Sequence, residues 1–118
     1  MRFRIYQIDL SRDARRMAFV DLETVLSRHD SGVDSGIYDC IYDGIADLHD
    51  LEDVFALFNS RPAGFTGRSL SVSDVVEIIT ADEIEPGFYY CDSIGFKRIA
   101  FDPSKTRDRV RKETEERA

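Results

Sequence analysis

Apolar residues in this chain come in short segments, and only one segment carries a clear helical repeat. In residues 50–59, Asp50 can accept hydrogen bonds from the first free backbone amides, and apolar side chains recur at positions i, i+3, i+4 and i+7. These side chains are Leu51, Val54, Phe55 and Phe58. The Arg61-Pro62 step ends the pattern, because proline disfavours a helical residue before it. A helix this short needs a surface on which to bury its apolar face, and the rest of the chain must supply it.

Other segments have the alternation, or the content of β-branched and aromatic residues, that favours strands. They are residues 2–9, 37–46, 75–80, 88–92 and 96–101. In the second of them we expect Tyr38, Cys40 and Tyr42 to share one face, because successive side chains of a strand alternate. Gly44 is expected to mark a bend or bulge. The short connection Ser93–Gly95 predicts a hairpin between the last two strands.

A second short helix is predicted for residues 21–28, with Asp21 as its cap. Its apolar face is formed by Leu22, Val25 and Leu26. The sequence therefore predicts an α+β fold: a small mixed, mostly antiparallel sheet with two short helices packed on it and a charged C-terminal tail. We expect one domain over residues 1–103. In the tail, residues 104–118, pairs of opposite charge four positions apart favour a frayed, solvent-exposed helix.

The composition is that of one globular domain that can bury a proper core. The chain has 118 residues, of which 42% are hydrophobic and 11% aromatic. Cys40 and Cys91 are too few for a disulfide scaffold. Arg2, Arg4 and Asp9 interrupt what would be the apolar part of a signal peptide, and no segment approaches the roughly 18 apolar residues of a membrane span. We therefore expect a cytoplasmic protein with reduced thiols and no membrane partner.

The net charge of −7 is unevenly distributed. Ten acidic residues and one base, Arg28, lie between Asp21 and Asp53. Five arginines precede them: Arg2, Arg4, Arg12, Arg15 and Arg16. Residues 102–118 hold six bases and five acids, which leaves −8 on the rest of the chain. Such a body repels nucleic acid at long range and is attracted to basic clefts, so direct binding of nucleic acid is not expected.

No arrangement of residues predicts a catalytic centre. Cys40 and Cys91 lie among apolar or aromatic neighbours on predicted strands, which favours buried structural thiols over nucleophiles. Many serines are present, but none has the spacing of a nucleophile elbow. We therefore expect a protein that is not an enzyme and that has no cofactor.

Two segments hold residue types that bind metals or phosphate. His49 lies among Asp47, Asp50 and Asp53, but the start of a helix explains these acids, and His29 is on another element. We expect no metal site. The loop Gly64–Ser69 contains glycines, hydroxyls and an arginine, but it lacks the Gly-Lys-Ser/Thr of a phosphate-binding loop. An ordered structural loop is the favoured interpretation.

Several short motifs in the second half of the chain form a recognisable series. They are Phe58-Asn59, Arg61-Pro62, Phe-Thr-Gly-Arg-Ser-Leu-Ser-Val-Ser-Asp-Val-Val over residues 65–76, and Tyr-Tyr-Cys-Asp-Ser-Ile-Gly-Phe over residues 89–96. In their order and separation they resemble the YodL-like family. These are small domains encoded on phages, plasmids and conjugative elements of Gram-positive bacteria. The acidic middle of the chain lies outside the resemblance.

The resemblance implies a domain that occurs alone or within large polyvalent proteins, beside DNA-processing and counter-defence genes. It implies no catalytic residue. The signature residues that we single out are Arg68, Ser71, Ser73, Asp74 and Asp92. They can be explained structurally: Arg68 can pair with Asp74 or Asp92, and the two serines can cap the turn into the strand.

Charge and resemblance together favour a non-enzymatic acidic binding protein of a mobile element. In this hypothesis it is a counter-defence inhibitor of the anti-CRISPR type, a DNA mimic whose carboxylates occupy a basic surface of a nucleic-acid-handling protein such as a CRISPR effector. The expected contact residues are Asp39, Asp43, Asp47, Asp50 and Asp53. One alternative is a nucleic-acid-associated accessory or nuclease that uses the N-terminal arginines and the Arg68 loop. Another is an adaptor module for a larger enzyme of the element.

Overall fold

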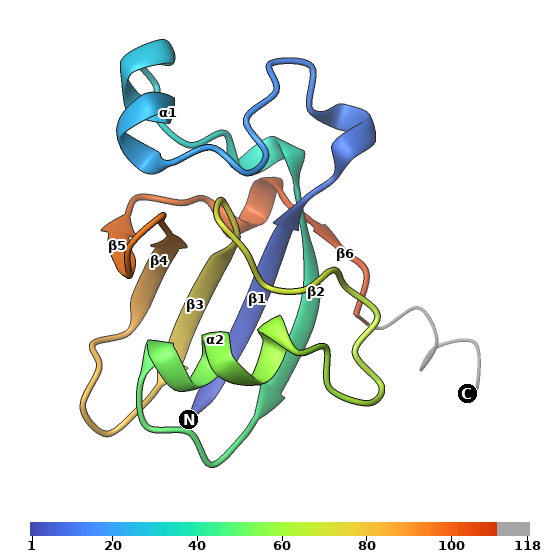
Figure 1. Ribbon diagram of the computed structural model, residues 1–118, viewed down its shortest axis with the longest axis vertical. Helices are drawn as coiled ribbons and strands as arrows, with labels where there is room; N and C mark the ends of the chain where they lie inside the picture. Colours follow the sequence, from blue (N-terminus) through green and yellow to red (C-terminus); the bar gives the residue numbers. More distant parts are fainter. Residues whose placement is uncertain (111–118) are drawn as a thin grey trace.

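The first strand, β1 (Arg2–Ile8), lies in the middle of the sheet because apolar side chains point from both of its faces. The computed structural model describes residues 1–110 (Figure 1). Antiparallel partners flank β1 on both sides, β2 (Tyr38–Ile45) and β3 (Val75–Thr80). The antiparallel strands β4 (Gly87–Cys91) and β5 (Phe96–Ile99) follow β3. At the other edge a two-residue strand, β6 (Arg107–Asp108), pairs with β2 in parallel.

The sheet order is therefore β5-β4-β3-β1-β2-β6. Two α-helices accompany it, α1 (Leu22–Arg28) and α2 (Leu51–Asn59). Short 3-10 helices occupy Leu10–Arg12, Ser35–Ile37 and Pro103–Lys105. The α+β fold with a mixed, mostly antiparallel sheet and two short helices is confirmed. Within residues 1–110, no helix is long and apolar enough to cross a membrane.

Each face of the sheet carries its own core. On the face covered by α2 (Figure 1), Phe3 and Ile5 of β1 pack with Val54 and Phe58 of the helix. On the opposite face, Tyr6 and Ile8 form a second core with residues of the sheet and of α1. These include Tyr38, Cys40, Val75 and Tyr90 from the sheet and Leu22 and Val25 from α1. The caps that the sequence predicts are present, since Asp21 accepts a hydrogen bond from the Thr24 amide and Asp50 from the Asp53 amide.

The predicted face assignment of β2 is wrong for one residue. A register shift opposite Ile5 and Tyr6 places Tyr42 across from Ile5 and Cys40 across from Tyr6. Tyr42 consequently faces α2, where its ring centroid lies 5.3 Å from that of Phe3 and 4.7 Å from that of Phe58. Tyr38 and Cys40 pack on the other side of the sheet. The register shift lies there and not at Gly44, where we expected it.

Two further expectations need correction. Leu26, expected on the apolar face of α1, is exposed, and only Leu22 and Val25 of that helix are buried. The prediction of a helical tail is wrong for residues 104–110. These residues complete a 3-10 helix and then form β6. Residues 111–118 lie outside the described part of the chain.

The packing of α2 predicts which aromatic residue of the helix contributes most to stability. Phe58 is 2% exposed and touches Phe3, Tyr42 and Phe65, whereas Phe55 is only half-buried. Phe58→Ala should therefore lower the free energy of unfolding by about 3–5 kcal/mol. Phe55→Ala, the matched control on the same helix, should cost clearly less. Equal losses in denaturant melts would contradict this orientation of α2.

Candidate functional site

Two loops leave the sheet beside the first residues of β1. Arg2 is paired with Ile45 of β2 on one side and with Thr80 of β3 on the other. The loop from β2 to α2 and the loop from β3 to β4 therefore lie at the same end of the sheet, next to the N-terminus (Figure 1). Apolar residues of both loops pack into one cluster below them. These are Ala46, Leu48, Ala81 and Ile84.

The two segments, residues 45–53 and 80–87, carry seven carboxylates and no lysine or arginine. The carboxylates are Asp47, Asp50, Glu52, Asp53, Asp82, Glu83 and Glu85. We call this surface the acidic end. Three of the seven have a local partner: Asp50 caps α2, Asp53 accepts a hydrogen bond from the His49 amide, and Glu85 pairs with Arg98 at 2.6 Å. That pair is exposed on both sides and contributes under about 1 kcal/mol.

The structure does not bring together the five aspartates that the sequence singles out. Asp39 is 3% exposed and lies between Arg12, Arg107 and Arg109, at 2.5, 3.0 and 3.4 Å. Asp43 is held by Arg2 and Arg4 at 3.5 and 3.0 Å, and its side chain is 15% exposed. Both carboxylates are thus neutralised within the fold. The three others, Asp47, Asp50 and Asp53, lie at the acidic end.

The loop from β3 to β4 contributes acids that the sequence alone did not indicate as part of a site. Asp82, Glu83 and Glu85 are about 30 residues away from the other acids in sequence, and only the sheet topology brings them together. The available signal was the strand pattern that ends at Thr80, which places these acids in a loop without saying which loop they face.

The N-terminal arginines do not form a free basic surface. Arg4 contacts both Asp43 and Glu77, and the hydrogen bond to Asp43 raises the pKa of its guanidinium. Arg12 contacts Asp9 and Asp39 and donates to the Gly36 carbonyl. Arg2 contacts Asp43. Of the remaining two, Arg15 approaches His29 Nδ1 at 3.4 Å, and both Arg15 and Arg16 are exposed.

The signature residue Arg68 is held by β1 and makes no ion pair with Asp74 or Asp92 within residues 1–110, contrary to expectation. The Gln7 side chain donates to the Arg68 carbonyl at 2.8 Å and accepts from the Arg68 amide at 3.0 Å. The Arg68 guanidinium donates to the Ile8 carbonyl at 2.8 Å. These contacts fix the loop that precedes β3 against β1.

Two of the other signature residues, Ser73 and Asp92, attach the start of α1 to the sheet. In the turn before β3 the Asp74 carboxylate accepts from the Ser71 amide, so the acid caps this turn in place of the serine hydroxyl that we expected. Ser73 Oγ accepts a hydrogen bond from the Phe19 amide at 2.9 Å, and the Tyr38 hydroxyl donates to the Ser73 carbonyl at 2.7 Å. Asp92 accepts from the Leu22 amide at 3.2 Å. Ser73 and Phe19 both have positive φ, so these contacts stabilise strained backbone.

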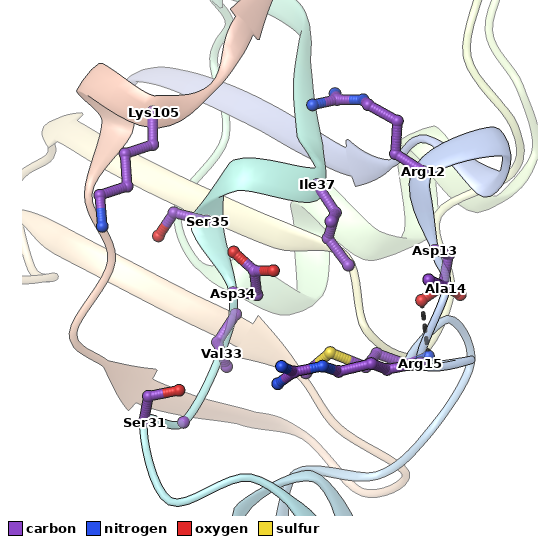
Figure 2. Close-up of a pocket in the computed structure, with 12 residues that line it drawn as sticks. Arg12, Asp13, Ala14, Arg15, Ser31, Val33, Asp34, Ser35, Ile37 and Lys105 are labelled. Carbon is purple, nitrogen blue, oxygen red and sulfur yellow. Dashed lines mark hydrogen bonds between the residues drawn. The ribbon is translucent and has the colours of Figure 1, made fainter.

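A pocket of about 370 Å³ lies between the segment 12–17, the segment 31–37 and Lys105. Figure 2 shows that basic and acidic side chains, among them Arg15, Lys105 and Asp34, border the same space. The Asp13 carboxylate accepts hydrogen bonds from the backbone amides of Met17 and Ala18. Charges of both signs therefore share this pocket, and no single ligand chemistry is indicated.

The thiols are structural. Cys40 and Cys91 are both buried and unbridged, as predicted, and burial raises the pKa of each to about 12. Within the described range no three His, Cys, Asp or Glu side chains form a group that could hold a metal ion.

Fold and site together define a small α+β domain with seven carboxylates, and no lysine or arginine, in two segments at one end of its sheet. The family model described as YodL-like domain matches residues 2–101. The chain belongs to the YodL-like domain family. The match runs from β1 through β5 and ends before β6. It includes the acidic middle of the chain, which we expected to lie outside the resemblance. Comparison with curated proteins and with solved structures found no match.

Asp74, the remaining signature acid, predicts a pH dependence of stability. It is 1% exposed, and burial raises its pKa to about 7, although the Ser71 amide and the Gln7 side chain donate to its Oδ2 atom. The folded state then binds more protons than the unfolded state between about pH 4 and 7. The contribution of Asp74 to stability should therefore fall as the pH rises through this range.

The comparison with Asp74→Asn isolates this effect. Each pKa unit corresponds to about 1.4 kcal/mol, so the wild type should lose a few kcal/mol relative to Asp74→Asn between pH 4 and pH 7.5. Denaturant melts across this range measure the difference. Parallel curves for the two proteins would show that Asp74 does not titrate in this way.

Proposed function

We propose that this chain is a non-enzymatic binding protein that engages a basic surface of a nucleic-acid-handling protein through its acidic end. The observation that carries the proposal is the gathering of seven carboxylates from two loops, with no lysine or arginine in either loop. Carboxylates that are not neutralised within the fold produce a local negative potential, which steers the molecule toward basic clefts.

The internal ion pairs strengthen this argument. Three of the N-terminal arginines form ion pairs within the fold. Arg2 pairs with Asp43, Arg4 with Asp43 and Glu77, and Arg12 with Asp9 and Asp39. At the acidic end, by contrast, Asp47, Glu52, Asp82 and Glu83 are all exposed and form no ion pair within residues 1–110. A surface of this kind can replace phosphate groups in a nucleic-acid-binding groove.

The finer proposal concerns the biological role. The YodL-like motifs suggest a mobile genetic element, and a small acidic protein of such an element can act as a counter-defence inhibitor. We propose a CRISPR effector as the partner, with the acidic end in the place of the nucleic acid. An adaptor role for a larger enzyme would use the same surface. The nuclease alternative loses support, because three of the N-terminal arginines are already occupied in ion pairs.

The experiment uses a panel of guide-loaded CRISPR effectors, with DNA cleavage as the readout and binding measured in parallel. The wild type should inhibit one of them. Asp82→Asn combined with Glu83→Gln should weaken inhibition about tenfold, and adding Asp47→Asn and Glu52→Gln should abolish it. None of these four carboxylates accepts a hydrogen bond among the described residues, so the variants should melt at the same or a higher temperature.

The matched control is Glu23→Gln with Asp30→Asn, which removes two equally exposed charges near α1. It should retain inhibition within about twofold. A folded quadruple variant that inhibits fully, or a control that fails as badly as the first double variant, would contradict the use of the acidic end. If no effector of the panel is inhibited, the CRISPR assignment is wrong.

A further inference from the structure

The strand β6 lies outside the residues that the family model matches. The family match ends at residue 101, and the five strands from β1 to β5 lie within it. β6 follows and covers the outer edge of β2 with only two residue pairs, Asp39 with Arg107 and Cys40 with Asp108. One more backbone bond, from the Arg109 amide to the Cys40 carbonyl at 3.0 Å, extends the contact.

Side chains provide most of the specific contacts of this strand. Arg107 donates to Asp39 at 3.0 Å and also contacts Asp9, and Arg109 reaches Asp39 at 3.4 Å. Alternate residues of an extended segment point the same way, so Arg107 and Arg109 both reach Asp39 while Asp108 points elsewhere. The edge of β2 thus recognises an extended segment with two arginines separated by one residue.

Asp39 does not depend on β6 for its neutralisation. Arg12 contacts it at 2.5 Å from a different segment of the chain. If β6 leaves, the buried carboxylate keeps one cation, and the large cost of an unpaired buried charge does not arise. The side chains of Arg107 and Arg109 are each 54% exposed, which limits what their ion pairs contribute.

The site continues beyond β6. Within residues 1–110 no strand pairs with Ile41–Ile45 on the outer side of β2. A groove of about 660 Å³ runs between this part of β2 and the loop of residues 64–68. Ile41, Tyr42, Asp43, Phe65, Arg109 and Val110 are among the residues that line it. An extended segment that follows the direction of β6 would enter this groove.

We propose that the outer edge of β2 is a binding site for an extended, arginine-containing segment of a partner protein, and that β6 occupies this site as an internal competitor. The partner strand pairs with β2 in parallel, as β6 does, and places two arginines, one residue apart, on Asp39 and Asp9. Binding displaces β6. The site is separate from the acidic end and does not depend on the function proposed above.

The test uses the full chain and a fluorescent peptide with the sequence of residues 103–110, Pro-Ser-Lys-Thr-Arg-Asp-Arg-Val. The chain variant Arg107→Gln/Arg109→Gln weakens the internal competitor. It should bind the peptide at least about tenfold more tightly than the wild type does in anisotropy titrations. A peptide with glutamine at both arginine positions should bind neither protein. The matched control Lys97→Gln/Arg98→Gln removes two cations from the opposite edge strand and should behave as the wild type.

A second measurement does not depend on the variant folding. Excess unlabelled peptide added to the ¹⁵N-labelled wild-type chain should accelerate hydrogen exchange of the Arg109 amide of the chain, because β6 is displaced. Equal affinity in wild type and variant, binding of the glutamine peptide, or an unchanged Arg109 exchange rate would overturn the proposal. Asp82→Asn/Glu83→Gln should retain peptide binding, which separates this site from the acidic end.

Discussion

The backbone pairing of β1 with both β2 and β3 is the interaction on which the rest of the structure depends. It places alternate β1 side chains in two cores, one under α2 and one beside α1. It also fixes Arg2 between Ile45 and Thr80, so that two acidic loops begin at the same end of the sheet. At the other end of β1, Gln7 binds the Arg68 loop. Fold, signature contacts and charge distribution therefore share one origin.

The distribution of charge follows from how the chain uses its arginines. Arg4 bridges Asp43 and Glu77 across three adjacent strands, and Arg12 and Arg107 converge on the buried Asp39. These pairs neutralise acids over the middle of the sheet. Among the residues that the structure describes, the loops at the acidic end receive one such partner, Arg98, which pairs with Glu85. These two loops therefore carry seven negative charges and no lysine or arginine.

Local signals in the sequence were sufficient for most of the secondary structure. Asp50 and the repeat from Leu51 to Phe58 predict α2, and the run from Val75 to Thr80 predicts β3, because caps and periodicity act within a few residues. The register shift in β2 was not predictable in this way. It depends on Tyr42 packing against Phe3 and Phe58, which are distant in sequence.

The candidate site was predicted only in part for the same reason. The charge pattern predicts that Asp39 is one of several exposed acids. In the structure Arg107, which is 68 residues away in sequence, forms an ion pair with it. Conversely, the sequence did not indicate that Asp82 and Glu83 belong to the site. They lie at the same end of the sheet as Asp47 and Glu52 because of the strand order. Arg68 was expected to pair with a carboxylate, yet it binds backbone and the Gln7 amide. Charge patterns along a sequence identify candidate residues, and topology decides which of them share a surface.

The central claim is that residues 45–53 and 80–87 form one negatively charged surface. Paramagnetic relaxation of backbone amides by a cationic and by a neutral nitroxide probe measures the local potential without any binding partner. The cationic probe should enhance relaxation selectively in both segments, and added salt should reduce the enhancement in both together. Enhancement confined to one segment, or spread equally over residues 21–39, would contradict the account.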